Sequence, residues 1–317
     1  MARVLVAEKL ADAGLDMLRG AGHAVDVRTG LSTDELRAAI AGAQALVVRS
    51  ATQVDADLLA AGDALVVVGR AGVGLDNVDV PAATERGVLV CNAPSSNVVS
   101  AAEMTVALML ALARNIPQAH QALSNGRWER SRWGGMEIYR KTIGILGLGR
   151  VGRLVSQRIA PFDVALIAYD PYVSPESARA AGVDMVTLEE LFERSDIITL
   201  HMPRTPETAG LLGAENLAKC RPHALIVNTA RGGILDEAAA AAALDAGRLG
   251  GIALDVYETE PMTESPLFGR PDVVATPHLG ASTAEAQDRA SIQIAEQINL
   301  ALAGDPVPYA VNGALRS

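Results

Sequence analysis

One stretch limits the possible folds of this chain more than any other, residues 141–152, which read KTIGILGLGRVG. Its apolar start, Thr142–Leu146, predicts a buried parallel strand. Gly147, Gly149 and Gly152 follow with the spacing G-x-G-x-x-G, and an apolar helical pattern begins at once. Such glycines permit a tight turn, the approach of a pyrophosphate to the backbone, and close packing of helix on strand. The stretch therefore predicts a strand–turn–helix unit with a phosphate site at the helix N-terminus.

A second predicted strand, residues 164–169, is followed by Asp170, which lies about 20 residues after Gly147. The dinucleotide fingerprint places an acid at this distance, where its carboxylate holds a ribose 2′-hydroxyl. Because a carboxylate repels a 2′-phosphate, Asp170 favours NAD over NADP. The glycine pattern alone is a weak signal, and its alternative is a strand–helix–strand unit that binds no dinucleotide. The acid at the expected distance makes NAD the preferred interpretation.

Composition limits the classes of function. The chain has 317 residues, of which 50% are apolar and 20% charged, which is enough for a large core and two domains. The net charge of −10 argues against a surface for nucleic acids or anionic membranes. We expect no transmembrane helix, no signal peptide and no metal site. We also expect Cys91 and Cys220 to be reduced thiols of a cytoplasmic protein.

Predicted strands alternate with predicted helices through the first 91 residues, which indicates a small parallel α/β domain. Ser32 and Glu35 form a capping box that marks the start of one of these helices. The predicted strands are residues 3–7, 24–27, 45–48, 65–68 and 88–91.

Polar segments follow three of these strands, at the edge where open α/β sheets bind ligands. They read RSAT, GRAGVGLDN and NAPSSN. Two arginines there predict an anionic substrate, because guanidinium groups match carboxylate and phosphate oxygens, and the glycine-containing loop offers N–H groups. Surface arginines and an ordinary turn are the alternative. The predicted substrate-binding residues are Arg49, Ser50, Arg70, Gly72, Val73, Gly74 and Asn97.

Two long helices are predicted on either side of the dinucleotide unit, at residues 100–114 and 283–302. The first is apolar nearly all round, so it should be buried between domains or between subunits. A shorter helix at 119–125 and an irregular loop at 126–140, which holds both tryptophans, follow it. We expect this loop to pack on a partner subunit, and we expect the two long helices to form a hinge-like connection around a cleft.

Three predicted strands in the second half, residues 225–228, 253–256 and 273–275, lead to residues that suit proton transfer and anion binding. Their carboxyl ends should face the same crevice as the glycine turn. Removing a hydride from an alcohol needs a base for the hydroxyl proton, a carboxylate that orients the base, and a cation that holds the substrate. The candidates are Arg231, Asp255 on its strand, Glu258, Glu260 and His278.

His278 is the preferred base, and Arg231 and Glu260 fill the other two roles. His201, which follows the predicted strand 197–200, is the rival base because it lies at the same edge of the sheet. Glu258 is the rival of Glu260. Placement along the chain leaves both alternatives open.

The sequence resembles the D-isomer-specific 2-hydroxyacid dehydrogenase family along almost its whole length. The matching segments are VVRSAT, GRAGVGLDNVD, KTIGILGLGRVG, YDPYVSP, NTARGGILDE, ALDVYETEP and TPHLGASTAEAQ. The resemblance implies an α/β protein with two Rossmann-like, doubly wound parallel sheets and a cleft between the domains. Residues 1–97 plus 284–317 would form the substrate-binding domain, and residues 98–283 the NAD-binding domain. It also implies a homodimer built on the NAD-binding domains.

The resemblance assigns roles to single residues. It implies that Arg231 binds the substrate, that Glu260 is the carboxylate partner and that His278 is the acid/base. Arg49 and Arg70 lie where some members of the family meet a substrate phosphate. The implied cofactor site comprises Gly147, Gly149, Arg150, Val151, Gly152, Asp170, His201, Met202, Pro203, Thr229, Ala230, Arg231, Asp255, His278 and Gly280.

The members that the chain resembles most oxidise D-3-phosphoglycerate to 3-phosphohydroxypyruvate with NAD, the first step of serine biosynthesis, and we expect this activity. Oxidation or reduction of another D-2-hydroxy acid, of the glyoxylate or hydroxypyruvate type, would use the same residues and is the first alternative. A non-catalytic NAD sensor similar to the C-terminal-binding-protein corepressors is the second. Longer members continue into a regulatory domain, so a chain ending at Ser317 is expected to be a short form or a trimmed one.

Overall fold

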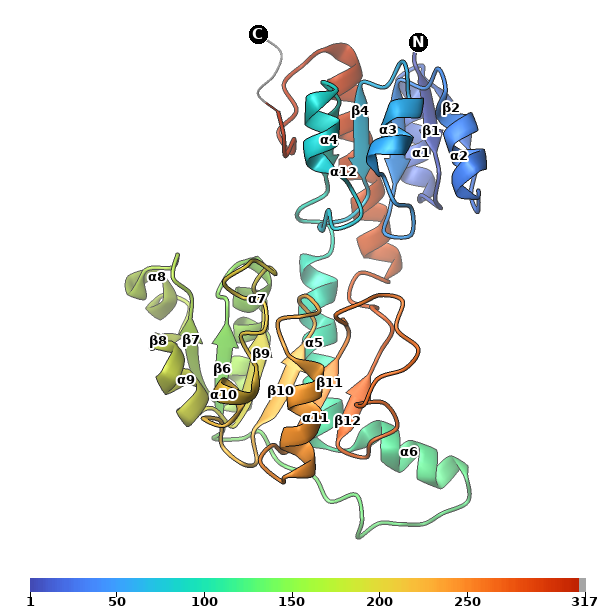
Figure 1. Ribbon diagram of the computed structural model, residues 1–317. Helices are drawn as coiled ribbons and strands as arrows, with labels where there is room; N and C mark the ends of the chain where they lie inside the picture. The colour runs from blue at the N-terminus through green and yellow to red at the C-terminus, as the bar shows by residue number, and fades with distance from the viewer. Residues whose placement is uncertain (314–317) are drawn as a thin grey trace. The chain divides into compact units, whose positions relative to one another are not determined.

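The computed structural model describes residues 1–313, which form two compact units (Figure 1). Unit 1 holds Met1–Asn97 and the chain from Ala281 onward, and unit 2 holds Val98–Gly280. The chain therefore leaves unit 1 once and returns to it once. The return falls directly after Gly280, shortly before the boundary at 283 that the sequence suggested.

Unit 1 is built on five parallel strands in the order β2-β1-β3-β4-β5. A helix connects each strand to the next, as parallel pairing requires. The central strand β3 is buried along its whole length, whereas the edge strand β2 is partly exposed. The elements are β1 (Arg3–Val6), α1 (Asp12–Gly20), β2 (Ala24–Val27), α2 (Thr33–Ile40), β3 (Ala45–Val48), α3 (Ala56–Ala61), β4 (Val67–Arg70), α4 (Val80–Glu85), β5 (Leu89–Asn92) and α12 (Ala284–Ala303).

Helices cover both faces of this sheet. α1 and α12 pack on one face around Leu18 and Ile294, and α2, α3 and α4 pack on the other around Ile40. The predicted capping box is confirmed, since the Ser32 hydroxyl accepts from the N–H of Glu35 and the Glu35 carboxylate accepts from the N–H of Ser32. Local sequence signals and burial of apolar faces thus agree in unit 1.

Unit 2 is built on seven parallel strands in the order β12-β11-β10-β9-β6-β7-β8. The order reverses at β6, which pairs with β7 on one side and with β9 on the other. Open α/β sheets bind ligands beyond the carboxyl ends of the strands at such a reversal. The elements are α5 (Val98–Ala113), α6 (Ile116–Ser124), β6 (Thr142–Leu146), α7 (Arg150–Ile159), η1 (Ala160–Phe162), β7 (Ala165–Tyr169), α8 (Pro175–Arg179), β8 (Asp184–Met185), α9 (Leu188–Arg194), β9 (Ile197–Leu200), α10 (Ala214–Leu217), β10 (Leu225–Asn228), α11 (Glu237–Asp245), β11 (Gly251–Leu254) and β12 (Val273–Ala275).

The apolar helix predicted at 100–114 is α5, and it packs against the sheet of unit 2. α5, α7 and α8 cover one face of the sheet, and α9, α10 and α11 cover the other. Thr105 and Met109 of α5 are fully buried. Within the described residues no single helix has the length and apolar character of a membrane span; only α5 and α6 taken together, at an angle of 63°, meet those criteria.

Two predicted strands are displaced by two residues, and glycines explain both errors. The strand predicted at 65–68 is β4, which continues through Gly69 to Arg70. A side chain at Gly69 would lie 2.8 Å from Ile294, so α12 can cover the strand only because glycine stands there. Arg70 is therefore the last residue of β4 and does not follow it.

The strand predicted at 253–256 is β11, which begins earlier, at Gly251. A Cβ at Gly251 would lie 2.9 Å from the carbonyl oxygen of Asp272, which is why the neighbouring backbone tolerates only glycine here. The predicted bounds put Asp255 on the strand, and the structure places it directly after the strand. Glycine generally weakens strands, so the sequence pattern favoured the glycine-free segment.

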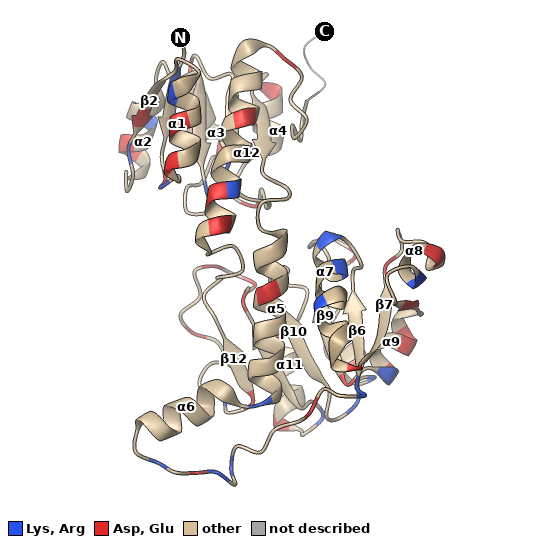
Figure 2. Cartoon of the chain, turned by 180° about the vertical axis from the view of Figure 1, so that it is seen from behind, with Lys and Arg blue, Asp and Glu red and all other residues tan. Residues whose placement is uncertain are grey.

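The helix predicted at 119–125 begins earlier, at Ile116, because Pro117 suits the first turn of a helix. We call residues 114–140, which comprise α6 and the loop after it, the arm. Figure 1 shows the arm running past the edge of the sheet of unit 2, and Figure 2 shows that α6 carries no charged residue. The arm exposes the large apolar side chains of Ile116, Leu123, Trp128 and Tyr139.

Candidate active site

The predicted site segments of unit 2 share one edge of its sheet, because each follows the carboxyl end of a parallel strand. The candidate acid/base and the glycine turn therefore face the same side, with the candidate arginine between them. In the order of the sheet these segments are His278 after β12, Asp255 and Glu260 after β11, Thr229 to Arg231 after β10, His201 to Pro203 after β9, Gly147 to Gly152 after β6 and Asp170 after β7.

The turn after β6 requires glycine for sterically distinct reasons. Gly147 has a φ of 93°, and a Cβ there would lie 2.8 Å from the carbonyl group of His201. A Cβ at Gly152 would collide with the carbonyl oxygen of Gly147. A Cβ at Gly149 would meet nothing within 4 Å, so this side of the turn is open. Gly149 is also the N-cap of α7 and has no capping side chain, so a phosphate can take the place of a cap.

Asp170 holds the same turn from the neighbouring strand. Its Oδ2 accepts from the N–H of Leu148 at 2.8 Å, and its Oδ1 accepts from the N–H of Tyr172 at 2.9 Å. Each carboxylate oxygen has a second lone pair, so Asp170 can also accept from a ribose hydroxyl. The open turn, the uncapped helix and this carboxylate together fit a dinucleotide.

His278 and Glu260 meet between the loops that follow β12 and β11. Nδ1 of His278 donates to Oε2 of Glu260 at 2.6 Å, and Oε1 of Glu260 accepts from the N–H of Tyr257 at 3.0 Å. His278 has a φ of 53°, a left-handed conformation that is uncommon for residues with a side chain. Because Nδ1 is held by the carboxylate, Nε2 is the ring nitrogen that can exchange a proton with a ligand.

The two groups shift each other's titration. The hydrogen bond to Glu260 raises the pKa of His278 above its ordinary value, although burial and the charge of Arg231 oppose the shift. Burial raises the pKa of Glu260, but the hydrogen bonds from His278 and Tyr257 outweigh burial and hold that pKa below its ordinary value. The pair therefore favours an imidazolium beside a carboxylate. The positive charge of Arg231, which follows β10 beside β11, also acts on both groups.

Asp255 braces the loop that carries His278. Its side chain is fully buried, and its Oδ1 accepts from the hydroxyl of Thr276 at 2.6 Å and from the N–H of Leu279 at 2.7 Å. Its Oδ2 accepts from the N–H of Gly280 at 2.7 Å. A buried carboxylate needs such donors, and here they fix the backbone on both sides of His278.

A second polar residue fixes the loop with Arg231. Asn228 donates from Nδ2 to the carbonyl of Arg231 at 2.9 Å and accepts from the N–H of Ala230 at 3.1 Å. The Arg231 guanidinium donates to the carbonyl of Ala230 at 2.7 Å. The hydroxyls of Thr229 and Thr105 lie 2.6 Å apart. Sequence reasoning singled out residues 229–231 but missed Asn228, which acts around a turn, and Thr105, which only the fold brings near Thr229.

The geometry favours His278 over His201 as the base and Glu260 over Glu258 as its carboxylate partner. Burial lowers the pKa of His201 to about 3, so this imidazole is neutral at physiological pH, and its Nε2 lies 3.0 Å from the hydroxyl of Thr199. Within residues 1–313, no carboxylate pairs with the His201 ring. The N–H of Glu258 donates to Glu237, and the carboxylate that contacts His278 is that of Glu260.

The predicted substrate residues lie at the carboxyl edge of unit 1. Arg49 directly follows β3, and its loop is held by Glu8 after β1. Oε1 of Glu8 accepts from the N–H groups of Arg49 and Thr52, and Oε2 accepts from the N–H of Ala51. Asn77 donates to the carbonyl of Arg49 at 2.7 Å. The loop with Arg49 and Ser50 thus has a defined shape.

Arg70 lies beside Arg49, since β3 and β4 are neighbours. A Cβ at Gly72 would collide with the guanidinium of Arg70, so glycine at this position makes room for the arginine. Asn92 donates to the carbonyl of Val73 at 2.6 Å and so fixes the loop that continues to Gly74. Sequence reasoning did not single out Glu8, and it included Asn77 and Asn92 in the polar segments without giving them a role, because each of them bonds to backbone groups of other segments.

Comparison with known proteins gives consistent results. Residues 106–280 match the family model described as D-isomer specific 2-hydroxyacid dehydrogenase, NAD binding domain. D-3-phosphoglycerate dehydrogenase from Mycobacterium tuberculosis is 56% identical over 311 residues, which are 98% of this chain and 58% of that relative. The chain thus spans less than two thirds of the length of such curated relatives.

Solved structures share the fold. The TT0316 protein from Thermus thermophilus has a TM-score of 0.90 at 33% identity, covering 98% of this chain and 99% of its own. NAD-dependent formate dehydrogenase from Staphylococcus aureus, in complex with NAD, has a TM-score of 0.85 at 31% identity, covering 96% of this chain and 97% of its own. These findings confirm the predicted α/β fold of two parallel sheets, the resemblance and NAD as the cofactor.

Proposed function

The chain belongs to the D-isomer specific 2-hydroxyacid dehydrogenase family, and we propose that it oxidises D-3-phosphoglycerate to 3-phosphohydroxypyruvate with NAD. This reaction is the first step of serine biosynthesis. The observation that carries the proposal is the His278–Glu260 pair, joined at 2.6 Å on the sheet edge that also carries the glycine turn. The name of the Mycobacterium tuberculosis relative supports the choice of substrate.

His278 is the acid/base of the proposed reaction. In the oxidation, its Nε2 accepts the proton of the C2 hydroxyl, while Glu260 stabilises the imidazolium that forms. In the reverse direction the imidazolium returns that proton to the carbonyl oxygen. NAD, bound at the glycine turn, would supply the acceptor for the hydride that leaves C2 of the substrate. Removing one proton and one hydride leaves the ketone, so the reaction balances without another reactant.

The neighbouring residues position the reacting groups. The Arg231 guanidinium binds the substrate carboxylate and polarises the oxygen at C2. Gly147, Gly149 and the start of α7 would hold the pyrophosphate of the cofactor, and Asp170 would accept from the adenosine ribose. Asp255 keeps the loop of His278 in place through the N–H groups of residues 279 and 280.

We assign substrate binding to unit 1 and cofactor binding to unit 2, with the boundaries near residues 97 and 283 that the sequence suggested. In unit 1, Arg49 and Arg70 hold the phosphate of the substrate, and the loops of residues 72–74 and Asn97 line the same edge of the sheet. The support is that Arg49 directly follows β3 and Arg70 ends the neighbouring strand β4, and that Asn77 bonds to the Arg49 carbonyl and to the Arg70 side chain. A phosphate dianion needs more than one cationic partner.

The test is a panel of 2-hydroxy acids assayed by formation of NADH, with D-3-phosphoglycerate and D-glycerate side by side. We expect Arg49→Ala to raise KM for D-3-phosphoglycerate by at least about tenfold, since a charge-assisted hydrogen bond is lost, and to leave KM for D-glycerate unchanged. Arg37→Ala is the matched control, because Arg37 pairs with Asp57 on the surface of α2 and α3.

Other outcomes distinguish the alternatives. Equal loss with both substrates would remove the phosphate site and favour a dehydrogenase of a plain D-2-hydroxy acid, of the glyoxylate or hydroxypyruvate type. No turnover with any member of the panel, with NAD binding intact, would favour a non-catalytic sensor.

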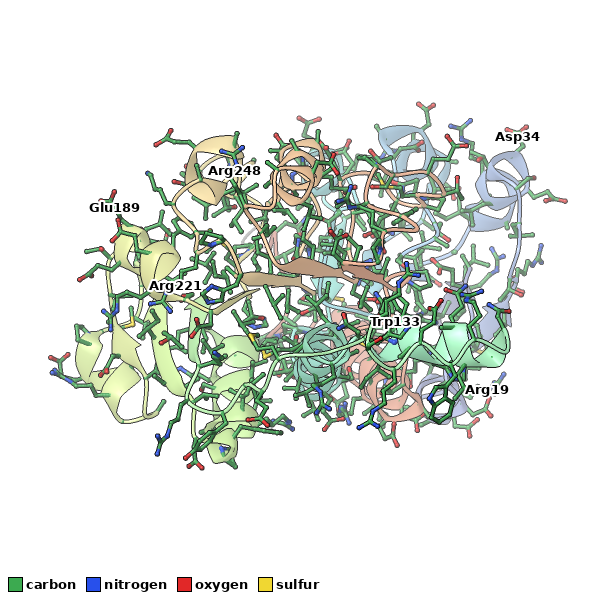
Figure 3. The ribbon with its side chains drawn as sticks, turned by 90° about the horizontal axis from the view of Figure 1, so that it is seen from below. Arg19, Asp34, Trp133, Glu189, Arg221 and Arg248 are labelled. Atoms are coloured by element: carbon green, nitrogen blue, oxygen red, sulfur yellow. The ribbon has the colours of Figure 1, made fainter. Side chains whose placement is uncertain are left out.

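We also place the protein in the cytoplasm as a homodimer, assembled through unit 2. Support for the dimer comes from the arm, where Trp128 is 81% and Leu123 56% exposed, since exposed large apolar side chains mark interfaces. Trp133 of the arm lies beside α6 (Figure 3), and its buried Nε1 has no hydrogen-bond partner among the described residues. Two unpaired cysteines, Cys91 and Cys220, suit a reducing compartment.

A further inference from the structure

The order of strands in unit 1 predicts a second ligand-binding position, at the carboxyl edge of its sheet. In the order β2-β1-β3-β4-β5, the strand order reverses at β1, which pairs with β2 on one side and with β3 on the other. Ligands of open α/β sheets bind beyond the carboxyl ends of the strands at such a reversal. The segment after β1 contains Glu8 and Lys9, and the segment after β3 begins with Arg49. Lys9 therefore lies at the position where the topology predicts a ligand.

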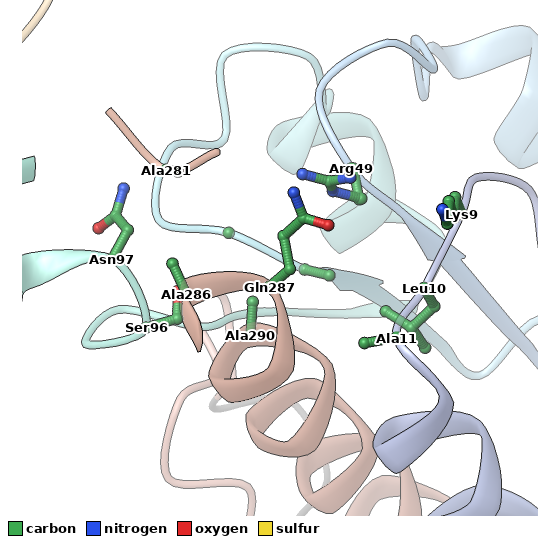
Figure 4. A pocket seen from close by; sticks show the side chains of 12 residues that line it. Lys9, Leu10, Ala11, Arg49, Ser96, Asn97, Ala281, Ala286, Gln287 and Ala290 are labelled. Atoms are coloured by element: carbon green, nitrogen blue, oxygen red, sulfur yellow. The ribbon is translucent and has the colours of Figure 1, made fainter. Parts of the chain in front are cut away.

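A small cavity opens at this place (Figure 4). Its volume is about 20 Å³, and its lining includes Lys9, Arg49, Gly72, Asn97 and Gln287. Figure 4 shows Lys9, Arg49 and Gln287 projecting from three different segments around it. This volume suffices for about one water molecule or one ligand oxygen. The cavity can thus take the tip of an oxyanion whose remainder stays outside.

The two cations at this cavity have no internal partner. Within residues 1–313, neither the ammonium of Lys9 nor the guanidinium of Arg49 makes an ion pair or a hydrogen bond. The adjacent carboxylate of Glu8 is engaged by the N–H groups of residues 49, 51 and 52. Lys219, by contrast, is paired with Glu215. Uncompensated positive charge at the carboxyl edge of the sheet favours the binding of an anion there.

We propose that Lys9 is a specificity-determining residue that binds the substrate phosphate together with Arg49. The inference rests on the proposed function, and it adds a residue from the segment after β1. A phosphate monoester carries close to two negative charges at neutral pH, whereas a carboxylate carries one, so a second cation favours phosphorylated over plain hydroxy acids. The lysine ammonium supplies a compact charge with three donors, and the arginine supplies a planar fork.

The test uses the full chain with NAD and the variant Lys9→Gln. We expect KM for D-3-phosphoglycerate and the inhibition constant of inorganic phosphate each to rise about tenfold, because one charge-assisted hydrogen bond is lost. The turnover number and inhibition by D-glycerate should not change. Lys9→Arg should restore most of the affinity, since it restores the charge. Lys219→Gln removes a lysine charge from the surface of unit 2 and should behave as wild type.

Two results would overturn the inference: no change of KM in Lys9→Gln, or equal weakening of phosphorylated and plain ligands. Failure of the proposed function is recognised separately, as a wild-type protein that does not oxidise D-3-phosphoglycerate. In that case calorimetric titration of inorganic phosphate decides. Binding that is about tenfold weaker in Lys9→Gln would support the phosphate site, and absent or unchanged binding would exclude it.

Discussion

At the scale of single residues, the candidate chemistry depends on a contact between His278 and Glu260, which lie on different loops. Sequence reasoning could choose both residues because histidine and glutamate at strand ends suit proton transfer. Placement along the chain left Glu258 as a rival of Glu260, since both lie in the same loop, and only the resemblance to the family selected Glu260. The structure separates them, because Glu260 accepts both from His278 and from the N–H of Tyr257. Only the backbone path of that loop determines which carboxylate turns inward.

The His278–Glu260 pair predicts the pH dependence of the reaction. Oxidation needs neutral His278, and Glu260 raises the pKa of this residue, so the rate of oxidation should rise as pH increases through a pKa above the ordinary histidine value. Glu260→Gln removes the stabilising charge from the imidazolium. The acid limb of kcat/KM for oxidation should therefore move to lower pH. In the reduction, which needs the imidazolium, the alkaline limb should move in the same direction.

The measurement is kcat/KM against pH in both directions, for wild type and Glu260→Gln. Glu258→Gln is the matched control, because its carboxylate belongs to the same loop and does not contact His278. If the acid limb of the oxidation profile stays in place in Glu260→Gln, or moves to higher pH, the group that titrates in the profile is not paired with Glu260.

At the scale of helices and strands, periodicity and capping predicted most elements, and glycines produced the main errors. Thr142–Leu146 and Leu225–Asn228 are strands with the predicted bounds, because each is a continuous apolar run buried on both faces. β4 and β11 were misplaced because each contains a glycine that a neighbouring element needs. The sequence shows such a glycine but not the helix or strand that approaches it.

The packing of α1 against α12 makes a stability prediction. A Cβ at Gly14 would lie 2.5 Å from the carbonyl oxygen of Ser291, which belongs to the backbone of α12 and cannot yield easily. We expect Gly14→Ala to lower the free energy of unfolding by about 1–3 kcal/mol, as overpacking does. Gly20 lies at the end of the same helix and has nothing within 4 Å of its Cβ position. Gly20→Ala should be neutral or stabilise by up to about 1 kcal/mol.

Urea unfolding of the two variants, followed by circular dichroism, checks this prediction. Equal midpoints for Gly14→Ala and Gly20→Ala would mean that α1 and α12 are not packed as closely as described. The pair of variants controls for helix propensity, since both replace glycine by alanine within α1.

At the scale of the whole molecule, the sequence predicted the two-sheet architecture and the strand ends that carry the candidate residues. It could not predict the residues that shape the loops. Glu8, Asn77 and Asn228 act on backbone groups distant in the chain or around a turn, so no spacing pattern reveals them. Lys9 was not singled out, because its position gains meaning only from the strand order of unit 1.

The proposed assembly makes a prediction about mass in solution. If the arm forms the dimer interface, Trp128→Ser should raise the dissociation constant of the dimer by at least about tenfold, since buried aromatic residues dominate interfaces. Tyr172 is 95% exposed outside the arm, so Tyr172→Ser is the matched control. Sedimentation equilibrium measures both variants. A wild-type protein that remains monomeric, or an unchanged dimer in Trp128→Ser, would contradict an interface at the arm.

The most direct test of the central claim is the rate of NADH formation from D-3-phosphoglycerate by the wild type and by His278→Ala, with NAD binding measured in both. A positioned acid/base contributes at least about a hundredfold, so we expect a loss of that size with NAD affinity retained. His223→Ala is the control, because His223 bonds to Asp196 ahead of β9 and β10, at the opposite edge of the sheet. Equal rates in the wild type and His278→Ala would contradict the account.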